Sequence, residues 1–387
     1  MKNLNYLAMG LMVSALSLNV ACDDENDNIN GDSNGNGNVT IEEPFTDILE
    51  TYVDKTVLPT YSEMKDRAWI LFEKVSQFKT DGTQASLDAA CEAWRNTREP
   101  WEKSEAFLFG PADFNRLDPM LDSWPLDEPQ IKSVLEGNSD LSDGGILGEN
   151  VRGFHTLEYL LFENGEERNA ADITERQKDY MYIVAQLLRN DCIQLWAGWH
   201  GTDGISEKDQ EVIDEFEISM PSPESGYAFE FKNAGKKGSR IMSQSNAIEQ
   251  IVDGCMDIAS EVSEQKIGTP FHLVLTDPQA ALYQVESWYS WNSLIDYENN
   301  IISIENSYFG RIQGNRGASL SEFIKEKDSA LDQEITNAIQ TARNEIHKIV
   351  APFRNSLKTD REQIEKAIDA CAALSSSLEK IKRYLDY

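Results

Sequence analysis

One hexapeptide of the chain combines two side chains that can bind a metal ion. Residues 153–158 read Gly-Phe-His-Thr-Leu-Glu, a Gly-x-His-x-x-Glu pattern in a chain that has four histidines. On a helix, His155 and Glu158 leave the same face, because residues three apart are neighbours there. An imidazole and a carboxylate can share a divalent metal through their lone pairs. Such a pair also occurs often without a metal, so further ligands must come from elsewhere in the chain.

A second pattern places charged residues where a helix should bury apolar ones. Alternating spacings of four and three predict a buried seam within a helix over 86–109, formed by Leu87, Cys91, Trp94, Arg98, Trp101, Glu105 and Leu108. Because an unpaired buried charge is strongly unfavourable, Arg98 and Glu105 need an explanation. They pair with each other, extend to solvent, or belong to a functional site. Glu102 is a candidate surface partner of Arg98, and Asp118 or Asp122 could reach back from the following loop.

The elements that must position these residues are predicted to be helices. Apolar residues recur at helical spacing over 45–78 with a kink at Pro59, and over 86–109, 153–162, 173–199, 241–262, 277–309, 321–350 and 361–384. Residues 110–150 are expected to form a long loop, and long loops in compact domains are often functional.

Because strand alternation is scarce, we expect an all-α fold of two antiparallel helical bundles. An N-terminal bundle over 41–215 carries the hexapeptide, a connection spans 216–240, and a C-terminal bundle covers 241–387. The segments 78–91 and 357–371 share a Lys-Thr-Asp turn followed by Asp-Ala, which fits two bundles of related design.

The N-terminus has the features of an export signal. Residues 1–21 combine Lys2 with an apolar stretch that ends in small residues, and Ala21-Cys22 resembles a bacterial lipobox. We therefore expect a lipid on Cys22 and an outer-membrane lipoprotein that faces the periplasm or the cell surface; an ordinary cleaved signal is the alternative. Residues 22–40 are rich in Asp, Asn and Gly, which predicts a disordered tether.

Composition narrows the classes of ligand. Of the 387 residues, 67 are Asp or Glu and 35 are Lys or Arg, which gives a formal net charge of −32. A surface this acidic repels phosphate backbones, so nucleic acid is not an expected partner. Residues 32–43 match a calcium-loop pattern, although an Asn/Gly-rich tether produces such matches by chance. The cysteines after Cys22 have no Cys-x-x-Cys spacing, so buried thiols are expected rather than a zinc site.

Several motifs, in order along the chain, resemble the imelysin-like proteins. They are the stretch from Trp94 to Pro111, Leu117-Asp118-Pro119, Trp124-Pro125-Leu126-Asp127, the hexapeptide, and the stretch from Glu286 to Asn300 with Tyr308-Phe309-Gly310. The resemblance covers the chain from about residue 42 onward. It implies two helical bundles with a pocket in the cleft between them, and an exported or lipid-anchored location in bacteria.

The resemblance also implies a set of site residues. In an iron-uptake relative, the matching positions bind metal, and here they fall on Glu105, Asp118, His155 and Glu158. By the same matching, the pocket is lined by Arg98, Ser290, Ser293, Asp296 and Asn300. Three carboxylates and an imidazole suit a divalent ion, with iron favoured and zinc or calcium as alternatives. Arg116 departs from the relative, which has an acidic residue there; a cation beside the site weakens metal binding or favours an anionic ligand.

Three functions are compatible with these residues. The leading hypothesis is an exported lipoprotein that binds a divalent metal or a small metal-bearing ligand for iron uptake, with a transporter as candidate partner. The first alternative is a metallopeptidase, since the family is also classed among these, with Glu158 or Glu105 as general base. The chain has no His-Glu-x-x-His motif, which favours the binding role. The second alternative is a structural or partner-binding surface lipoprotein.

Overall fold

The protein is described by a computed structural model that covers residues 44–138, 140–141, 147–220, 225–312 and 317–385. Over these ranges it is helical apart from one two-stranded ladder of β1 (Phe162–Glu163) with β2 (Glu166–Glu167). The all-α prediction is confirmed. The signal peptide, Cys22, the tether and the calcium-loop match at 32–43 lie outside the described residues. None of the described helices combines the length and the apolar composition needed to cross a bilayer.

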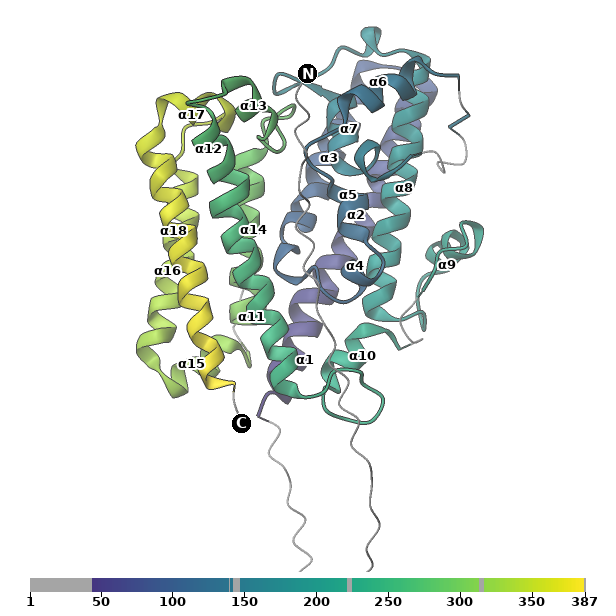
Figure 1. The fold of residues 1–387 in the computed structure, drawn as a ribbon. Coiled ribbons are helices and arrows are strands. Elements are labelled where there is room, and N and C mark those ends of the chain that lie inside the picture. Colours follow the sequence, from purple (N-terminus) through teal and green to yellow (C-terminus); the bar gives the residue numbers. More distant parts are fainter. Residues whose placement is uncertain (1–43, 139, 142–146, 221–224, 313–316, 386–387) are drawn as a thin grey trace, which may run out of the picture. The chain divides into compact units, whose positions relative to one another are not determined.

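The first half of the chain builds one group of helices (Figure 1). They are α1 (Thr46–Tyr52), α2 (Leu58–Asp81), α3 (Gln84–Glu102), α4 (Pro111–Phe114), α5 (Leu117–Asp122), α6 (Glu128–Glu136), α7 (Gly153–Leu161), α8 (Glu175–His200), α9 (Glu207–Glu215) and α10 (Gly226–Lys232). The long helix α2 packs against both α3 and α8, and the short α7 lies against α3 and α8. The hexapeptide therefore rests on the helix that carries Arg98.

The second half forms another group, on the left of Figure 1. It consists of α11 (Gln244–Glu261), α12 (Thr269–Leu273), α13 (Pro278–Tyr283), α14 (Ser293–Phe309), α15 (Leu320–Lys327), α16 (Ser329–His347), α17 (Phe353–Thr359) and α18 (Arg361–Glu379). Helix α18 packs on α11 and α16, and α14 packs on α11 and α16. Because α14 also contacts α3, it joins the two groups of helices.

Local sequence signals explain where several of these helices begin and end. Helix α2 ends at Gly82, whose left-handed φ of 61° suits a residue without a side chain. The side chain of Thr83 then caps α3 by accepting the backbone N–H of Ser86. Helix α8 starts with a reciprocal capping box between Thr174 and Gln177. These short connections make α2 and α3 antiparallel neighbours.

Two expectations about local structure are wrong. The helix predicted over 86–109 ends at Glu102, and Glu105 lies in a separate 3₁₀ turn, Glu105–Phe107. The expected loop over 110–150 contains α4, α5 and α6, whose first turns contain Pro or an acidic residue. At Pro59, where a kink is expected, a π-helical turn, η1 (Val53–Val57), joins α1 to α2 directly before the proline.

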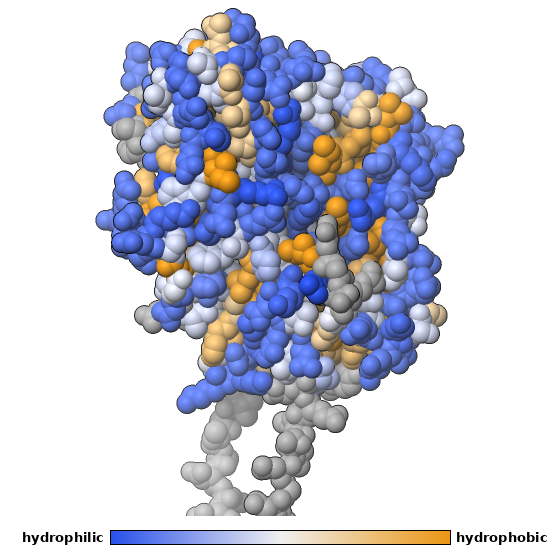
Figure 2. Space-filling view, turned by 180° about the vertical axis from the view of Figure 1, so that it is seen from behind, coloured by the Kyte–Doolittle hydropathy of each residue, from blue (hydrophilic) through white to orange (hydrophobic). Residues whose placement is uncertain are grey.

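The apolar seams of the helices face inward and the polar residues face outward. Figure 2 shows mostly hydrophilic residues on the face in view, with smaller hydrophobic patches between them. The thiols of Cys91, Cys192, Cys255 and Cys371 are free and buried. The expectation of buried thiols is thus confirmed for these cysteines.

The glycine of the hexapeptide permits a close approach of two helices. Gly153 has a φ of +79°, and a Cβ atom added there would lie 2.3 Å from the carbonyl oxygen of Leu121. Only a residue without a side chain fits this contact and this conformation. Since Leu121 immediately precedes Asp122, the contact also brings the last residue of α5 next to His155 in the first turn of α7.

We predict that Gly153→Ala destabilises the protein by at least about 2 kcal/mol more than Gly204→Ala. Gly204 is a matched control, because its φ is +77° but no atom lies within 4 Å of an added Cβ. Urea denaturation of both variants measures the difference in free energy of unfolding. Equal losses would show that backbone strain alone, rather than the contact with α5, requires the glycine.

Candidate metal centre

Arg98 is a fully buried cation that gathers four carboxylates. Its Nε donates to Asp296 at 3.1 Å and its Nη2 donates to Glu286 at 3.0 Å, while its Nη1 donates to Asp122. The Nη2 atom also lies 2.7 Å from Oε1 of Glu102 as an ion pair. Burial lowers the pKa of Arg98, but the four carboxylates together raise it well above its usual value. The guanidinium therefore stays charged inside the protein.

This network replaces the pairings expected from sequence. Arg98 neither pairs with Glu105 nor extends to solvent, and Glu102 is fully buried rather than at the surface. Glu105 instead lies 3.7 Å from Nζ of Lys266, a residue of the second half of the chain. The seam of α3 can thus carry a charge, because three of the four acids around Arg98 come from segments distant in the sequence.

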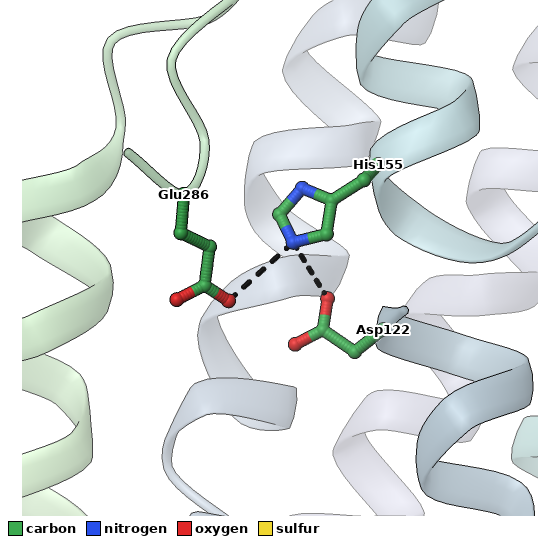
Figure 3. Close-up of side chains that lie close together, drawn as sticks. All are labelled: Asp122, His155 and Glu286. Atoms are coloured by element: carbon green, nitrogen blue, oxygen red, sulfur yellow. Dashed lines mark hydrogen bonds and ion pairs between the residues drawn. The ribbon is translucent and has the colours of Figure 1, made fainter. Parts of the chain in front are cut away.

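His155 sits between a supporting carboxylate, Glu158, and two further acids, Asp122 and Glu286, which Figure 3 draws beside it. Its Nδ1 lies 2.9 Å from Glu158, and its Nε2 lies 3.1 Å from Asp122 and 3.4 Å from Glu286. Because an ionised carboxylate only accepts hydrogen bonds, Nδ1–H donates to Glu158. The other oxygen of Glu158 accepts the backbone N–H of Ser290 at 2.8 Å and its hydroxyl at 2.7 Å. Glu158 therefore orients the imidazole, and Nε2 faces Asp122 and Glu286.

The electrostatic balance keeps Asp122 and Glu286 ionised. Burial raises the pKa of Asp122, but Arg98 and His155 outweigh burial and hold it well below the usual value. Burial acts likewise on Glu286, where Lys266 and His155 bring the pKa down to about 2. Burial and Arg98 lower the pKa of His155, yet the contacts with Asp122 and Glu158 raise it well above 6.5. Without a metal, both ring nitrogens of His155 are therefore protonated at neutral pH, and the imidazole carries a positive charge.

A cavity of about 370 Å³ lies beside the cluster. It is lined by Glu105, Leu108, Asp118, Pro119, Asp122, Ser123, Trp124, Pro125, Glu261, Gln265, Lys266, Thr269, Gln284 and Glu286. Five of these residues are acidic, and Lys266 is basic. Although Asp118 is exposed, the surrounding protein and the charge of Asp122 raise its pKa to about 6. This crowding of negative charge favours a cation in the cavity.

The pocket residues implied by resemblance support the acids rather than line this cavity. Ser293, Asp296 and Asn300 share the buried face of α14, as their spacing predicts. Ser293 donates to the carbonyl oxygen of Glu286 at 2.6 Å, and Asn300 donates to the Glu102 carboxylate at 2.6 Å. They fix the positions of two acids that surround Arg98.

The predicted metal ligands fall into two places. His155 and Glu158 lie together as expected, but Glu158 uses its oxygens for His155 and Ser290. Glu105 and Asp118 line the cavity. Arg116 does not line this cavity; its side chain is 71% exposed and pairs with Glu149. The ligand set predicted from resemblance remains a prediction.

Two other groupings bring ligand atoms closer together. Among the described residues, potential ligand atoms lie within 4.8 Å of one another in the set Asp122, His155 and Glu286, and in the set Glu102, Glu105 and Asp122. From the sequence, Asp122 is expected only to reach back toward the helices. Glu286 is the acid that opens the motif Glu286–Asn300, and this position is the signal from which its role could be predicted. Lys266 had no such signal.

We predict that Arg98→Met destabilises the protein by about 3–5 kcal/mol, because the buried carboxylates of Asp122 and Glu286 lose their partner and the other acids around Arg98 lose a hydrogen-bond donor. Arg95→Met is the matched control on the same helix. Arg95 pairs with Glu167 at 2.7 Å, but both side chains are about one-third exposed, so its loss costs about 1 kcal/mol or less. Chemical denaturation at neutral pH compares the two. Similar losses would mean that the network around Arg98 contributes no more than a surface ion pair.

We also predict that Glu102→Gln flattens the pH dependence of stability. Burial raises the pKa of Glu102 from 4.5 to about 8, against the opposing effect of Arg98. The folded state therefore holds this proton more tightly, so its contribution to stability is full below pH 4.5 and is lost as the pH rises through 8. Urea midpoints at several pH values, in the presence of a chelator, give the difference between variant and wild type. A difference that does not change with pH would contradict the shift.

Comparisons of sequence and structure with known proteins identify the family of the chain. The family model of peptidase M75, imelysin, matches residues 57–381. Iron-regulated protein A of Synechococcus elongatus is 28% identical over 335 residues, which cover 86% of this chain and 84% of that protein. The crystal structure of a proposed iron-regulated protein A precursor from Parabacteroides distasonis has a TM-score of 0.79 at 34% identity, and covers 91% of this chain and 97% of that one.

An imelysin-like protein from Psychrobacter arcticum shares the fold alone. Its TM-score is 0.61 at 11% identity, with coverage of 85% of this chain and 92% of that chain. The family match spans most of the chain, and the resemblance inferred from the motifs is confirmed. The chain belongs to the imelysin family.

Proposed function

We propose that this protein binds a divalent metal, iron foremost, through Asp122, His155 and Glu286. One observation carries the proposal: Nε2 of the imidazole and one oxygen of each carboxylate all lie within 4.8 Å of one another. One imidazole and two carboxylates suit Fe²⁺, Zn²⁺ or Mn²⁺. Iron is favoured because two similar proteins are named iron-regulated protein A or its precursor.

The donor residues fit a metal if the contacts that Arg98 makes with all three of them are exchanged. His155 must give up the proton on Nε2, since only the neutral ring nitrogen is a ligand. Nη2 of Arg98 lies 3.3 Å from Nε2 of His155 and 3.0 Å from Oε1 of Glu286, and Nη1 donates to Asp122; a cation bound there replaces these contacts. Arg98 keeps its bond to Asp296. Glu158 already holds the imidazole from its far side, as carboxylates do for histidine ligands in metal sites.

The cavity supports a binding role in iron uptake. Its volume of about 370 Å³ exceeds that of a bare ion, so a hydrated metal or a small metal-bearing ligand has room beside the cluster. Within this proposal, the protein is exported, anchored to the outer membrane by a lipid on Cys22, and delivers its cargo to a transporter. The acidic cavity would attract cations from the surrounding solution.

The metallopeptidase alternative has less support from the geometry. A general base must be free to take a proton from water. Glu158 is instead engaged by His155 and Ser290. Burial raises the pKa of Glu105 well above its usual value, so this carboxyl tends to hold a proton. We therefore put binding before catalysis.

We predict that His155→Ala lowers the affinity for Mn²⁺ or Fe²⁺ by roughly 100-fold or more, because a ligand is lost. Glu158→Gln should lower this affinity by roughly 10- to 100-fold, because the imidazole is no longer held in place. Calorimetric titration of the anaerobic protein measures both. His347→Ala is the control, since that side chain is 78% exposed. Equal affinities in wild type and His155→Ala would refute the proposed centre.

A further inference from the structure

Lys266 is a buried cation whose position the metal proposal does not require. Its residue is 8% exposed, and its Nζ lies 3.3 Å from Glu286, 3.7 Å from Glu105 and 4.0 Å from Glu102. A charge-assisted hydrogen bond between an ammonium and a carboxylate is usually about 2.7–2.9 Å long. The Lys266 ammonium is therefore shared among three acids instead of bound closely to one, much as a small cation would be.

The backbone around Lys266 is built to present it at this place. Lys266 lies in a π-helical segment, η5 (Val262–Gly268), that joins α11 to α12. In a regular α-helix its carbonyl oxygen would accept the N–H of residue 270, but Pro270 has none. The hydroxyl of Tyr297, on α14, donates to this oxygen instead, at 3.1 Å. π-Helical turns of this kind often mark functional sites.

The side chain also lines the same cavity as two of the proposed ligands, Asp122 and Glu286. Lys266 lines the cavity together with Glu105 and Glu286. Glu286 belongs to the proposed ligand set, whereas Glu105 lines this cavity and an adjoining acidic hollow of about 390 Å³. A cation in the cavity that approaches Glu286 therefore meets the Lys266 ammonium, whose Nζ lies 3.3 Å from Oε2 of this carboxylate.

We propose that the Lys266 ammonium competes with incoming cations for the carboxylates of the centre, so that only a cation of higher charge displaces it. The inference rests on the proposed metal function and deepens it. A sodium or potassium ion carries no more charge than the ammonium it would displace, so it gains little by entering. A divalent ion binds the same carboxylates more strongly, and the flexible stem of the lysine lets the ammonium move into the cavity. Lys266 thus excludes monovalent ions in favour of divalent ones.

The test compares Lys266→Met, Lys266→Gln and Lys266→Arg with the wild type, using Mn²⁺ as a probe in low and high KCl. Removing the charge should raise Mn²⁺ affinity by about tenfold or more and make it fall more steeply with KCl, because potassium can now compete. Lys266→Arg should keep the wild-type affinity and salt response. Lys366→Met, which removes an exposed charge paired with Glu362, controls for net charge and should change the affinity less than about twofold.

Thermal unfolding separates this role from a purely structural one. Both roles predict that Lys266→Met is less stable without metal, but only competition predicts a larger stabilisation by Mn²⁺ than in the wild type. Unchanged or weaker Mn²⁺ binding in Lys266→Met and Lys266→Gln would overturn the inference while leaving the metal proposal intact. Binding by these variants but not by the wild type would support the inference and overturn the proposed function; binding by none would overturn both.

Discussion

The buried charge of Arg98 is the constraint on which the rest of the structure depends. A guanidinium without solvent must be neutralised, and its four partners come from α3, from the end of α5, from the segment before α14 and from α14 itself. Two of them, Glu286 and Asp296, belong to the second half of the chain. The same ion pairs that hold α14 against α3 therefore also hold the candidate ligands Asp122 and Glu286 in place.

This arrangement places three positive charges at the candidate centre, and they differ in how firmly they are held. Arg98 is fixed by several bonds in the interior, while Lys266 is shared loosely among acids at the cavity. The proton of His155 is a third charge, and it can leave. Together these charges stabilise the folded protein around its buried carboxylates when no metal is bound. In our proposal, Nε2 of His155 and one oxygen each of Asp122 and Glu286 remain able to bind a metal. In our account, Arg98 positions the acids of the site, whereas the Lys266 ammonium and the His155 proton leave when a metal binds.

The sequence predicts those features that depend on local spacing. The helical class, the shared face of Ser293, Asp296 and Asn300, and the hexapeptide helix follow from periodicity, and Arg98 is buried on α3 as the spacing of its seam predicts. The partners could not be predicted in this way. Glu158 is held by Ser290, 132 residues away, and no local rule fixes that pairing. The end of α3 at Glu102 and the π-helical turns η1 and η5 do not follow from apolar spacing, which does not register a change in the type of helical turn.

The central claim is that the metal binds beside His155 through Nε2. A crystal structure of the Zn²⁺- or Mn²⁺-loaded protein, with an anomalous difference map recorded at the metal edge, tests it most directly. Our account predicts one strong peak about 2.0–2.2 Å from Nε2 of His155 and from oxygens of Asp122 and Glu286. A strong peak elsewhere in the cavity, among Glu105, Asp118 and Glu261 and without the imidazole, would contradict it.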